Sequence, residues 1–501
     1  MENIYFVLIM VTLLCVSLIC NQKTQDIEEQ FIIPSCVLRT HGRNASGDFV
    51  TRSIQNVSST TDRLDPKDYL LYLPENELHN PIIPAAKNVT NDRKDDAYVT
   101  FDSSHSVNPK YRFHPENKHQ VTFLLNKKKF GTDVRVSGGN NTFNDISITK
   151  DTMIRTDRFN QILNINQSKK QVTVESGVLL EDLNKALFST GMSLPVLPEC
   201  MKHSVGGAVS TSVHGTCINR GSLSSYIIDI TMVLPTGKIK TFTKKDKEFK
   251  ALTTGLGCLG LIYSVTLQCV DPFTIRHEEI LSNWDELSQN LKTYLDSNNL
   301  LQIYLIDPYD PKLPCVVFLR KKMDIKSTEE VEVTQDYNRN LRIGHAHQIL
   351  GNDIQGKFTE QEIGVGLKDL NDAVQNVVTF VRGYKKEFDL VSKYPIIIRF
   401  SGKDKNSYLS SSKRKTTAWI SIYNESEDVK KDCLDKMTNE IEDRLILKYK
   451  GRPNYSKRNF LNEEKMSLLY GHCYRDFQYV RNSLDPERLF TNEYIKRVIG
   501  E

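Results

Sequence analysis

The spacing of apolar and polar residues predicts a mixture of helices and strands from about Tyr111 onward. Residues 121–131 (VTFLLNKKKFG) predict a short helix, and residues 133–141 (DVRVSGGNN) predict a strand that enters a glycine-asparagine turn. A hairpin of two alternating strands is expected over 161–177, and an amphipathic helix over 178–191. Three more strands follow within 226–243 and 255–270. Such irregular alternation is typical of an α+β fold.

The same pattern divides the chain into parts. Residues 21–105 are polar and irregular, and we interpret them as an extension, whereas 106–273 form the first folded domain. Residues 274–501 predict a second α+β domain laid over the first. Its clearest elements are amphipathic helices over 369–384 and 432–449 and strands over 395–402 and 417–424.

An uncharged apolar run occupies residues 5–20, within an expected targeting segment 1–20. Its length suits a signal peptide or signal anchor and is slightly short for a membrane span. No basic residue precedes the run, so the sequence does not decide whether it is cleaved. A buried N-terminal helix is the less favoured alternative. We therefore expect the secretory pathway, with a secreted or membrane-anchored product. Glycosylation sequons give weak support for secretion; they include Asn44, Asn56, Asn88 and Asn424.

Composition narrows the function classes. With 39% hydrophobic and 26% charged residues, the chain has a globular composition, and its length of 501 residues favours two or three domains. The net charge of +4 is the small difference between 66 basic and 62 acidic residues, which argues against a nucleic-acid partner. The cysteines beyond residue 20 show no metal-ligand spacing, so no metal site is expected, and disulfide pairing stays open; they are Cys36, Cys200, Cys217, Cys258, Cys269, Cys315, Cys433 and Cys473.

Three glycine-bearing turns carry the candidate chemistry. In 137–142 (SGGNNT), glycines let backbone amides approach a phosphate closely, although a plain surface turn is the alternative. Small residues over 204–216 could lay the backbone flat against a planar ligand, with His214 near the end; a packed loop with a core histidine is the alternative. The turn 255–260 has the same two interpretations.

The order of these motifs resembles a known family. The segments VSGGNNT (136–142), VTVESG (172–177), GGAVSTSVHGTC (206–217), GLGCLGLIYSVTLQC (255–269) and LDPERLFTNEY (484–494) are similar to those of vanillyl-alcohol-oxidase-type flavoenzymes. The resemblance is strongest to the aldonolactone oxidases, which include L-gulonolactone and arabinonolactone oxidases. It implies a two-subdomain FAD-binding domain followed by an α+β cap domain. The FAD-binding residues it implies are Ser137, Gly138, Gly139, Asn140, Asn141, Thr142, Ser204, Gly206, Gly207, Thr211, His214, Thr216, Gly260 and Ile262.

Two departures concern the cofactor. Asn141 stands where the most similar family members have a histidine that bonds covalently to flavin. Asparagine has no nucleophilic ring nitrogen, so we predict noncovalent FAD. Cys217 replaces a usual glycine; a thioether to the flavin is one alternative, and a packed thiol is the favoured one.

Two further departures concern catalysis. The family's E-x-R strand matches Arg399, but Ile397 replaces the glutamate; in the segment 451–457, Asn454 replaces a histidine while Lys457 is kept. The resemblance implies that Arg399 and Lys457 are catalytic, in hydride transfer from a CH–OH group of a sugar lactone or polyol to flavin. Oxygen or another acceptor would then reoxidise the flavin. The alternative is a secreted flavin-binding homologue with weakened catalysis, because isoleucine can neither accept a proton nor bind a hydroxyl.

Overall fold

The computed structural model describes residues 97–127, 131–297, 300–323, 334–336, 341–351, 357–392, 394–413, 415–425 and 431–501. The apolar run 5–20 and the sequons at Asn44, Asn56 and Asn88 lie outside these ranges. Within them, no helix is both long enough and apolar enough to cross a membrane. The sequon at Asn424 is only 3% exposed within β18 (Thr417–Glu425), so the folded chain does not offer it as a glycan acceptor.

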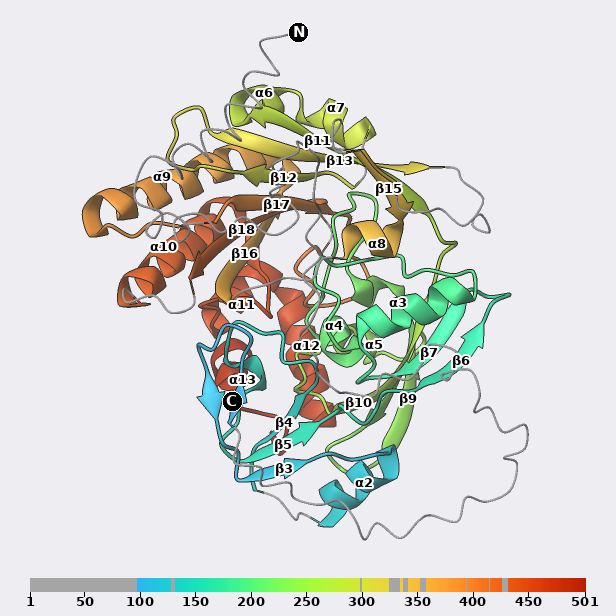
Figure 1. The fold of residues 1–501 in the computed structure, drawn as a ribbon. Helices are drawn as coiled ribbons and strands as arrows, with labels where there is room; N and C mark the ends of the chain where they lie inside the picture. Colours follow the sequence, from blue (N-terminus) through green and yellow to red (C-terminus); the bar gives the residue numbers. More distant parts are fainter. Residues whose placement is uncertain are drawn as a thin grey trace, which may run out of the picture.

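Two sheets build the N-terminal part of the molecule (Figure 1). The first is parallel, in the order β3 (Tyr111–Phe113), β5 (Thr152–Arg155), β4 (Val134–Ser137). The second is antiparallel, in the order β6 (Ile162–Asn166), β7 (Gln171–Glu175), β10 (Leu261–Gln268), β8 (Ile227–Val233), β9 (Ile239–Thr243). Strand β4, the hairpin over 161–177 and strands β8, β9 and β10 confirm the sequence-based predictions, whereas β3 and β5 were not predicted.

Short helices accompany these sheets. They are α2 (Lys118–Lys127), α3 (Leu180–Ser189), α4 (Val205–Ser210) and α5 (Phe249–Leu252). Helix α3 stops just before Gly191, whose positive φ of 71° suits glycine. Helix α4 occupies part of the small-residue stretch 204–216, and the Ser204 side chain caps it by accepting from the Gly207 amide at 3.4 Å.

The part of the N-terminal extension that the structure describes is folded. Strands β1 (Tyr98–Val99) and β2 (Ser106–Val107) form a small hairpin against the parallel sheet. The Ser137 hydroxyl donates to the Tyr98 hydroxyl at 2.7 Å, which ties the hairpin to the end of β4.

A nine-stranded antiparallel sheet forms the cap. Its order is β14 (Thr334–Asp336), β15 (Leu341–His345), β11 (Thr274–Asn283), β13 (Pro314–Met323), β12 (Gln302–Leu305), β17 (Ile396–Ser401), β18 (Thr417–Glu425), β16 (Phe358–Gly366), β19 (Arg452–Pro453). Helices α9 (Leu370–Phe388) and α10 (Lys431–Tyr449) lie side by side along it, and α6 (Trp284–Gln289), α7 (Leu291–Ser297) and α8 (Ala346–Leu350) lie at its other end (Figure 1).

Strand β17 occupies the middle of this sheet. Its alternate residues Ile396, Ile398 and Phe400 pack into the apolar core under α9 and α10. The residues between them, Ile397 and Arg399, therefore point to the opposite face, toward the N-terminal part. The run 395–402 is thus a buried central strand, as its apolar sequence predicts.

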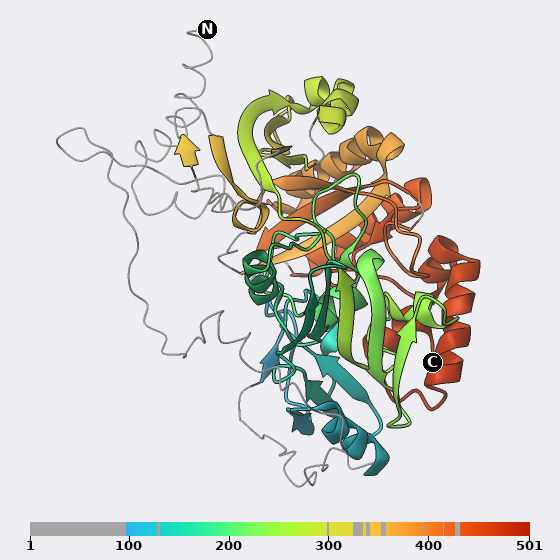
Figure 2. The same cartoon turned by 90° about the vertical axis from the view of Figure 1, so that its right-hand side faces the viewer.

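The chain ends by returning to the N-terminal part. Helices α11 (Glu463–Tyr470), α12 (His472–Leu484) and α13 (Glu493–Ile499) lie beside the antiparallel five-stranded sheet (Figure 2). Met466, Phe477 and Val498 belong to the same buried cluster as Val172 and Val205. The first core is therefore completed by the last helices of the chain.

Candidate active site

The three glycine-bearing turns converge on one cavity. Arg135 of β4 donates through its guanidinium to the carbonyls of Leu256 and Gly257, both at 3.0 Å, which holds the third turn against the first. A β-carbon on Gly138 would lie 2.0 Å from the Ser204 hydroxyl, so the first turn and the start of α4 touch only because glycine is there. Burial lowers the pKa of Arg135 to about 10, and it stays charged.

This cavity is lined by twelve of the fourteen predicted FAD-binding residues: Ser137, Gly138, Gly139, Asn140, Asn141, Thr142, Ser204, Gly206, Gly207, Thr211, Gly260 and Ile262. Sequence reasoning missed other lining residues, which carry no glycine signature; they include Tyr98, Arg135, Thr156, Ser176, His203 and Ser456. The convergence is a structural fact, and the contacts of each residue with FAD stay predictions.

The cavity suits a phosphate-bearing cofactor. Buried hydroxyls of Thr142 and Ser176 line it and have no hydrogen-bond partner among the described residues. Unpaired buried hydroxyls cost free energy unless a ligand or water satisfies them. With the glycine turn 137–142, they supply donors for a pyrophosphate.

The remaining two predicted residues lie outside that cavity lining. Thr216 donates through its hydroxyl to the Leu301 carbonyl and accepts from the Phe400 amide at 3.4 Å. His214 lies 4.0 Å from the Trp419 ring and parallel to it, and its Nε2 lies 3.1 Å from Glu362. Both residues join the N-terminal part to the cap sheet.

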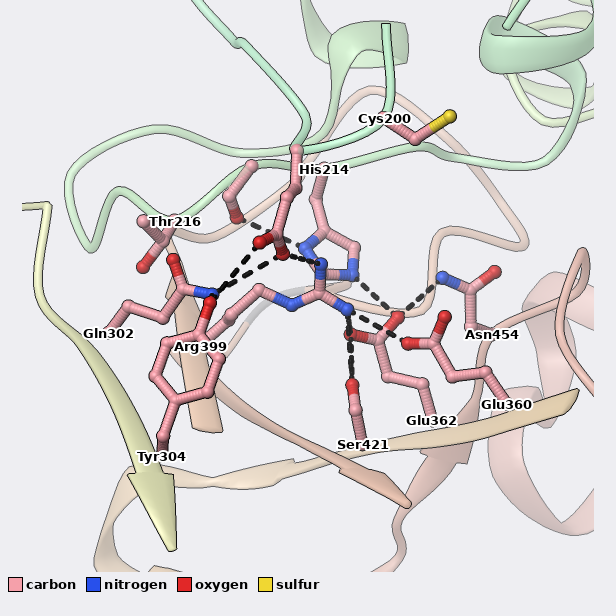
Figure 3. A network of polar contacts seen from close by, with 12 residues as sticks. Cys200, His214, Thr216, Gln302, Tyr304, Glu360, Glu362, Arg399, Ser421 and Asn454 are labelled. Atoms are coloured by element: carbon pink, nitrogen blue, oxygen red, sulfur yellow. Dashed lines mark hydrogen bonds and ion pairs between the residues drawn. The ribbon is translucent and has the colours of Figure 1, made fainter. Parts of the chain in front are cut away.

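A buried cluster of charges lies where His214 meets the cap (Figure 3). Arg399 is at its centre: one guanidinium nitrogen donates to Glu362 at 2.6 Å, Glu360 at 3.0 Å and the Ser421 hydroxyl at 3.1 Å. The other terminal nitrogen lies 3.6 Å from the carboxylate of Glu199. Burial alone would lower the pKa of Arg399, but these carboxylates raise it well above the ordinary value.

Lys457 is the second cation of the cluster. Its ammonium pairs with Glu360 and lies 4.3 Å from the centre of the Phe143 ring. The catalytic pair predicted from the sequence is therefore in one place, joined through Glu360. The roles of Arg399 and Lys457 in catalysis stay predictions.

Glu362 is bound by four protein donors. Arg399 and Ser421 donate to one oxygen, and Asn454 (2.7 Å) and His214 (3.1 Å) contact the other. Burial raises the pKa of this carboxyl, but the charges of Arg399, His214 and Lys457 hold it well below its ordinary value. It is an anion of the buried interior.

Of the departures at Ile397 and Asn454, Asn454 contacts this same carboxylate, and Ile397 lies in the same row of the cap sheet. Ile397 pairs across the sheet with Ser421, and Ser421 pairs with Glu362. Ile397 itself packs among aromatic rings that include Phe143, Tyr304, Phe358 and Tyr423. The acidic residues absent from β17 are present on β16, two strands away.

The cavity and the cluster adjoin each other. Ser456 lines the cavity, and Lys457 is the next residue. Burial lowers the pKa of His203, a lining residue, to about 4, with further lowering by the charges of Lys457 and Arg399. A cofactor in this cavity would therefore lie close to the charged cluster.

Cys217 contacts the cap backbone. Its amide donates to the Phe400 carbonyl at 2.7 Å, and its half-buried thiol lines a small hollow with Arg220 and Phe273. Burial raises the pKa of this thiol, which therefore stays protonated. Within the described residues the cysteines are free thiols.

Comparison with known proteins agrees with this geometry. Residues 109–243 match the FAD binding domain family, and residues 322–498 match the D-arabinono-1,4-lactone oxidase family. The fold resembles cholesterol oxidase from Brevibacterium sterolicum, with a TM-score of 0.68 over 80% of this chain and 96% of that one, at 15% identity. The chain is thus an α+β flavoprotein of the vanillyl-alcohol-oxidase type.

Its relatives narrow the class. The chain is 26% identical over 410 residues to L-gulono-1,4-lactone dehydrogenase of Mycobacterium tuberculosis, covering 74% of this chain and 91% of the relative. It is 24% identical over 442 residues to L-gulonolactone oxidase of Mus musculus, covering 79% and 96%. The chain belongs to the aldonolactone oxidase and dehydrogenase family of FAD-dependent oxidoreductases.

Proposed function

We propose that this chain oxidises a CH–OH group of a sugar lactone or related polyol and passes the electrons to oxygen or another acceptor. The observation that carries the proposal is the buried cluster of Arg399, Lys457 and three glutamates beside the FAD cavity. A nonpolar or unpaired site would support flavin binding alone, whereas this cluster supplies cations and acceptors that suit several hydroxyls.

Bound FAD supplies the two-electron acceptor of the reaction. The chain's own contribution is to hold and orient the hydroxyls and to balance charge. Arg399 keeps its positive charge in a buried place, where electrostatic stabilisation is strong because little water competes. Lys457, whose side chain is 15% exposed, is the more accessible of the two cations.

The cofactor is proposed to bind without a covalent bond. Asn141 lines the cavity, and its amide donates to the carbonyls of Gly139 at 3.0 Å and Lys202 at 2.6 Å. Its side chain thus stabilises the loop and offers no nucleophile. Acid precipitation of the purified protein is expected to release all the flavin into the supernatant, and yellow colour in the pellet would contradict this.

The main experiment is anaerobic mixing of the flavin-loaded protein with a panel of sugar lactones and polyols. Bleaching of the oxidised flavin spectrum by one of them is the expected result. Flavin binding without turnover is the second candidate, and the apolar packing of Ile397 favours it. A spectrum unchanged by every compound would support that second candidate.

We also propose that residues 5–20 direct the chain to the secretory pathway, as a secreted or membrane-anchored protein. The support is the uncharged apolar run in the sequence. Expression of the full chain with and without residues 1–20, followed by cell fractionation, tests it. Recovery of both forms in the cytosol would contradict it.

A further inference from the structure

Glu199 connects the cavity wall with the charged cluster. It lies in the loop before α4, four positions ahead of His203, which lines the cavity. The Tyr304 hydroxyl donates to one of its carboxylate oxygens at 3.2 Å, and Arg399 lies 3.6 Å from the other. Its side chain is 13% exposed, against 2% for Glu360 and 1% for Glu362. It is the most accessible carboxylate of the cluster.

The other two carboxylates are less suited to receive a proton. Both oxygens of Glu362 are bound by protein donors, and the charges around it hold its pKa well below the ordinary value. Glu360 bridges the two cations, Arg399 and Lys457, one at each oxygen. Protonation of either carboxylate would break a buried ion pair.

Glu199 also reaches the place where β17 lacks an acid. Its partner Tyr304 is the cross-strand neighbour of Ile397 in the cap sheet, and both side chains belong to one cluster on the same face. A carboxylate from the N-terminal loop therefore approaches the row of the sheet in which Ile397 stands.

A chain of buried residues fixes this carboxylate. Gln302 contacts Glu199 through its amide nitrogen at 3.4 Å, and Arg320 donates to the Gln302 amide oxygen at 2.7 Å, which sets the amide orientation. Arg320 also donates to Nδ1 of His277 at 3.0 Å. Burial lowers the pKa of His277 to about 2, so its ring is neutral and accepts that bond. Figure 3 shows Tyr304, Gln302 and Arg399 directed toward one another from β12 and β17.

We propose that Glu199 is the catalytic base of the reaction, which rests on the function proposed above. The substrate O–H bond breaks and its proton passes to a Glu199 carboxylate oxygen, while the C=O bond forms. The C–H bond would break at the same carbon, and bound FAD would supply the two-electron acceptor for its hydride pair. Arg399, beside Glu199, stabilises the negative charge that develops on the substrate oxygen.

The test compares flavin reduction in wild type, Glu199→Gln and Glu116→Gln. Glutamine keeps the size of Glu199 and one acceptor oxygen but cannot take the proton, so the reduction rate is expected to fall by about 10²–10⁴-fold. Glu116 is exposed and pairs with Arg158 far from the cluster, so its variant is expected to keep the wild-type rate. The dissociation constant of a lactone that does not reduce the flavin, followed by the change in flavin absorbance, is expected to stay within about threefold in Glu199→Gln.

A second variant, Glu199→Ala, distinguishes a catalytic role of Glu199 from a purely structural one. Glu199→Ala is expected to be slow and to regain rate when formate is added, because a free carboxylate can enter the vacated space, whereas chloride gives no recovery. A wild-type rate in Glu199→Gln, or loss of flavin from both variants, would overturn the assignment while the proposed function stands. If wild type itself reduces with no lactone or polyol, the proposed function and the base assignment both fail.

Discussion

The FAD cavity and the charged cluster adjoin each other but are built in opposite ways. The cavity wall comes from three turns in which glycine brings backbone segments together, as Gly138 does beside Ser204. The cluster is made of charged side chains from β16, β17 and two loops, all buried against one another. The shape of the cavity depends on glycines, because a side chain there would push the turns apart. The stability of the cluster depends on each buried charge having a partner of opposite charge. Substitutions should therefore act differently in the two regions.

Among the substitutions that compare these two regions, Arg399→Ala is expected to have the largest effect. It leaves Glu199, Glu360 and Glu362 without their shared cation, so flavin reduction should slow by about 10²–10³-fold. Unfolding free energy should fall by about 3–5 kcal/mol, because unpaired buried charges are costly. Stopped-flow absorbance and denaturant titration measure the two quantities. Arg399→Lys keeps the charge but loses the planar guanidinium, so its reduction rate should lie between those of wild type and Arg399→Ala. Equal rates in all three proteins would contradict a central role of Arg399 in the cluster.

In the cavity, the backbone should matter most at Gly139. A β-carbon there would lie 2.5 Å from the Lys202 carbonyl oxygen, so Gly139→Ala must separate two loops. The affinity for FAD is expected to fall by about 10–100-fold, measured by fluorescence titration of the apoprotein. Gly383→Ala is the matched control: no atom lies within 4 Å of the added carbon in α9, so FAD affinity should not change. Its unfolding free energy should rise by about 0.5–1 kcal/mol.

The pH dependence of stability should distinguish Glu362 from a surface acid. Its pKa is lowered in the folded chain, so its contribution to stability is present above the ordinary value of 4.5 and is lost as pH falls below it toward the folded value. Below pH 4.5 the unfolding free energy of wild type should fall more steeply than that of Glu362→Gln, by up to about 1.4 kcal/mol per pH unit. Parallel curves from denaturant titrations would show that the charge at Glu362 adds nothing.

The smallest effect is expected from Asn141→Ala. The substitution removes two hydrogen bonds from a partly exposed side chain but leaves the backbone turn in place. FAD affinity should fall by less than about tenfold, against the larger loss in Gly139→Ala. A greater loss in Asn141→Ala than in Gly139→Ala would reverse the distinction between a backbone site and a side-chain site.

The same difference explains how much the sequence could predict. Glycine turns leave a mark in the sequence, and together with the family resemblance they predicted half of the residues that line the cavity. The main helices and strands around it were predicted too. Arg399 and Lys457 were expected from their motifs, and both pair with Glu360. The absence of an acid at position 397 could be read from the sequence. The carboxylates that lie near Arg399 instead could not.

Glu199, Glu360 and Glu362 were missed for a physical reason. Strand β16 has the sequence FTEQEIGVG, whose four consecutive polar residues are what an exposed segment would show, although the strand is buried on both faces. A buried glutamate can be predicted only when the cation that pairs with it is known. Here that cation, Arg399, is on β17, and β18 lies between β17 and β16. Glu199 lies in the loop LPECMK, which has no periodic pattern. The two-residue spacing of Glu360 and Glu362, equal to that of an E-x-R strand, was the available signal.

The return of the last three helices to the N-terminal part limits the order in which the protein can fold during synthesis. When synthesis has passed residue 273, every strand of the first two sheets exists, yet the core against the five-stranded sheet still lacks Met466, Phe477 and Val498. The cap sheet, whose strands lie between residues 274 and 453, can close earlier. The region made first is therefore finished last, and its exposed apolar surface must be shielded from aggregation until the whole chain has been released.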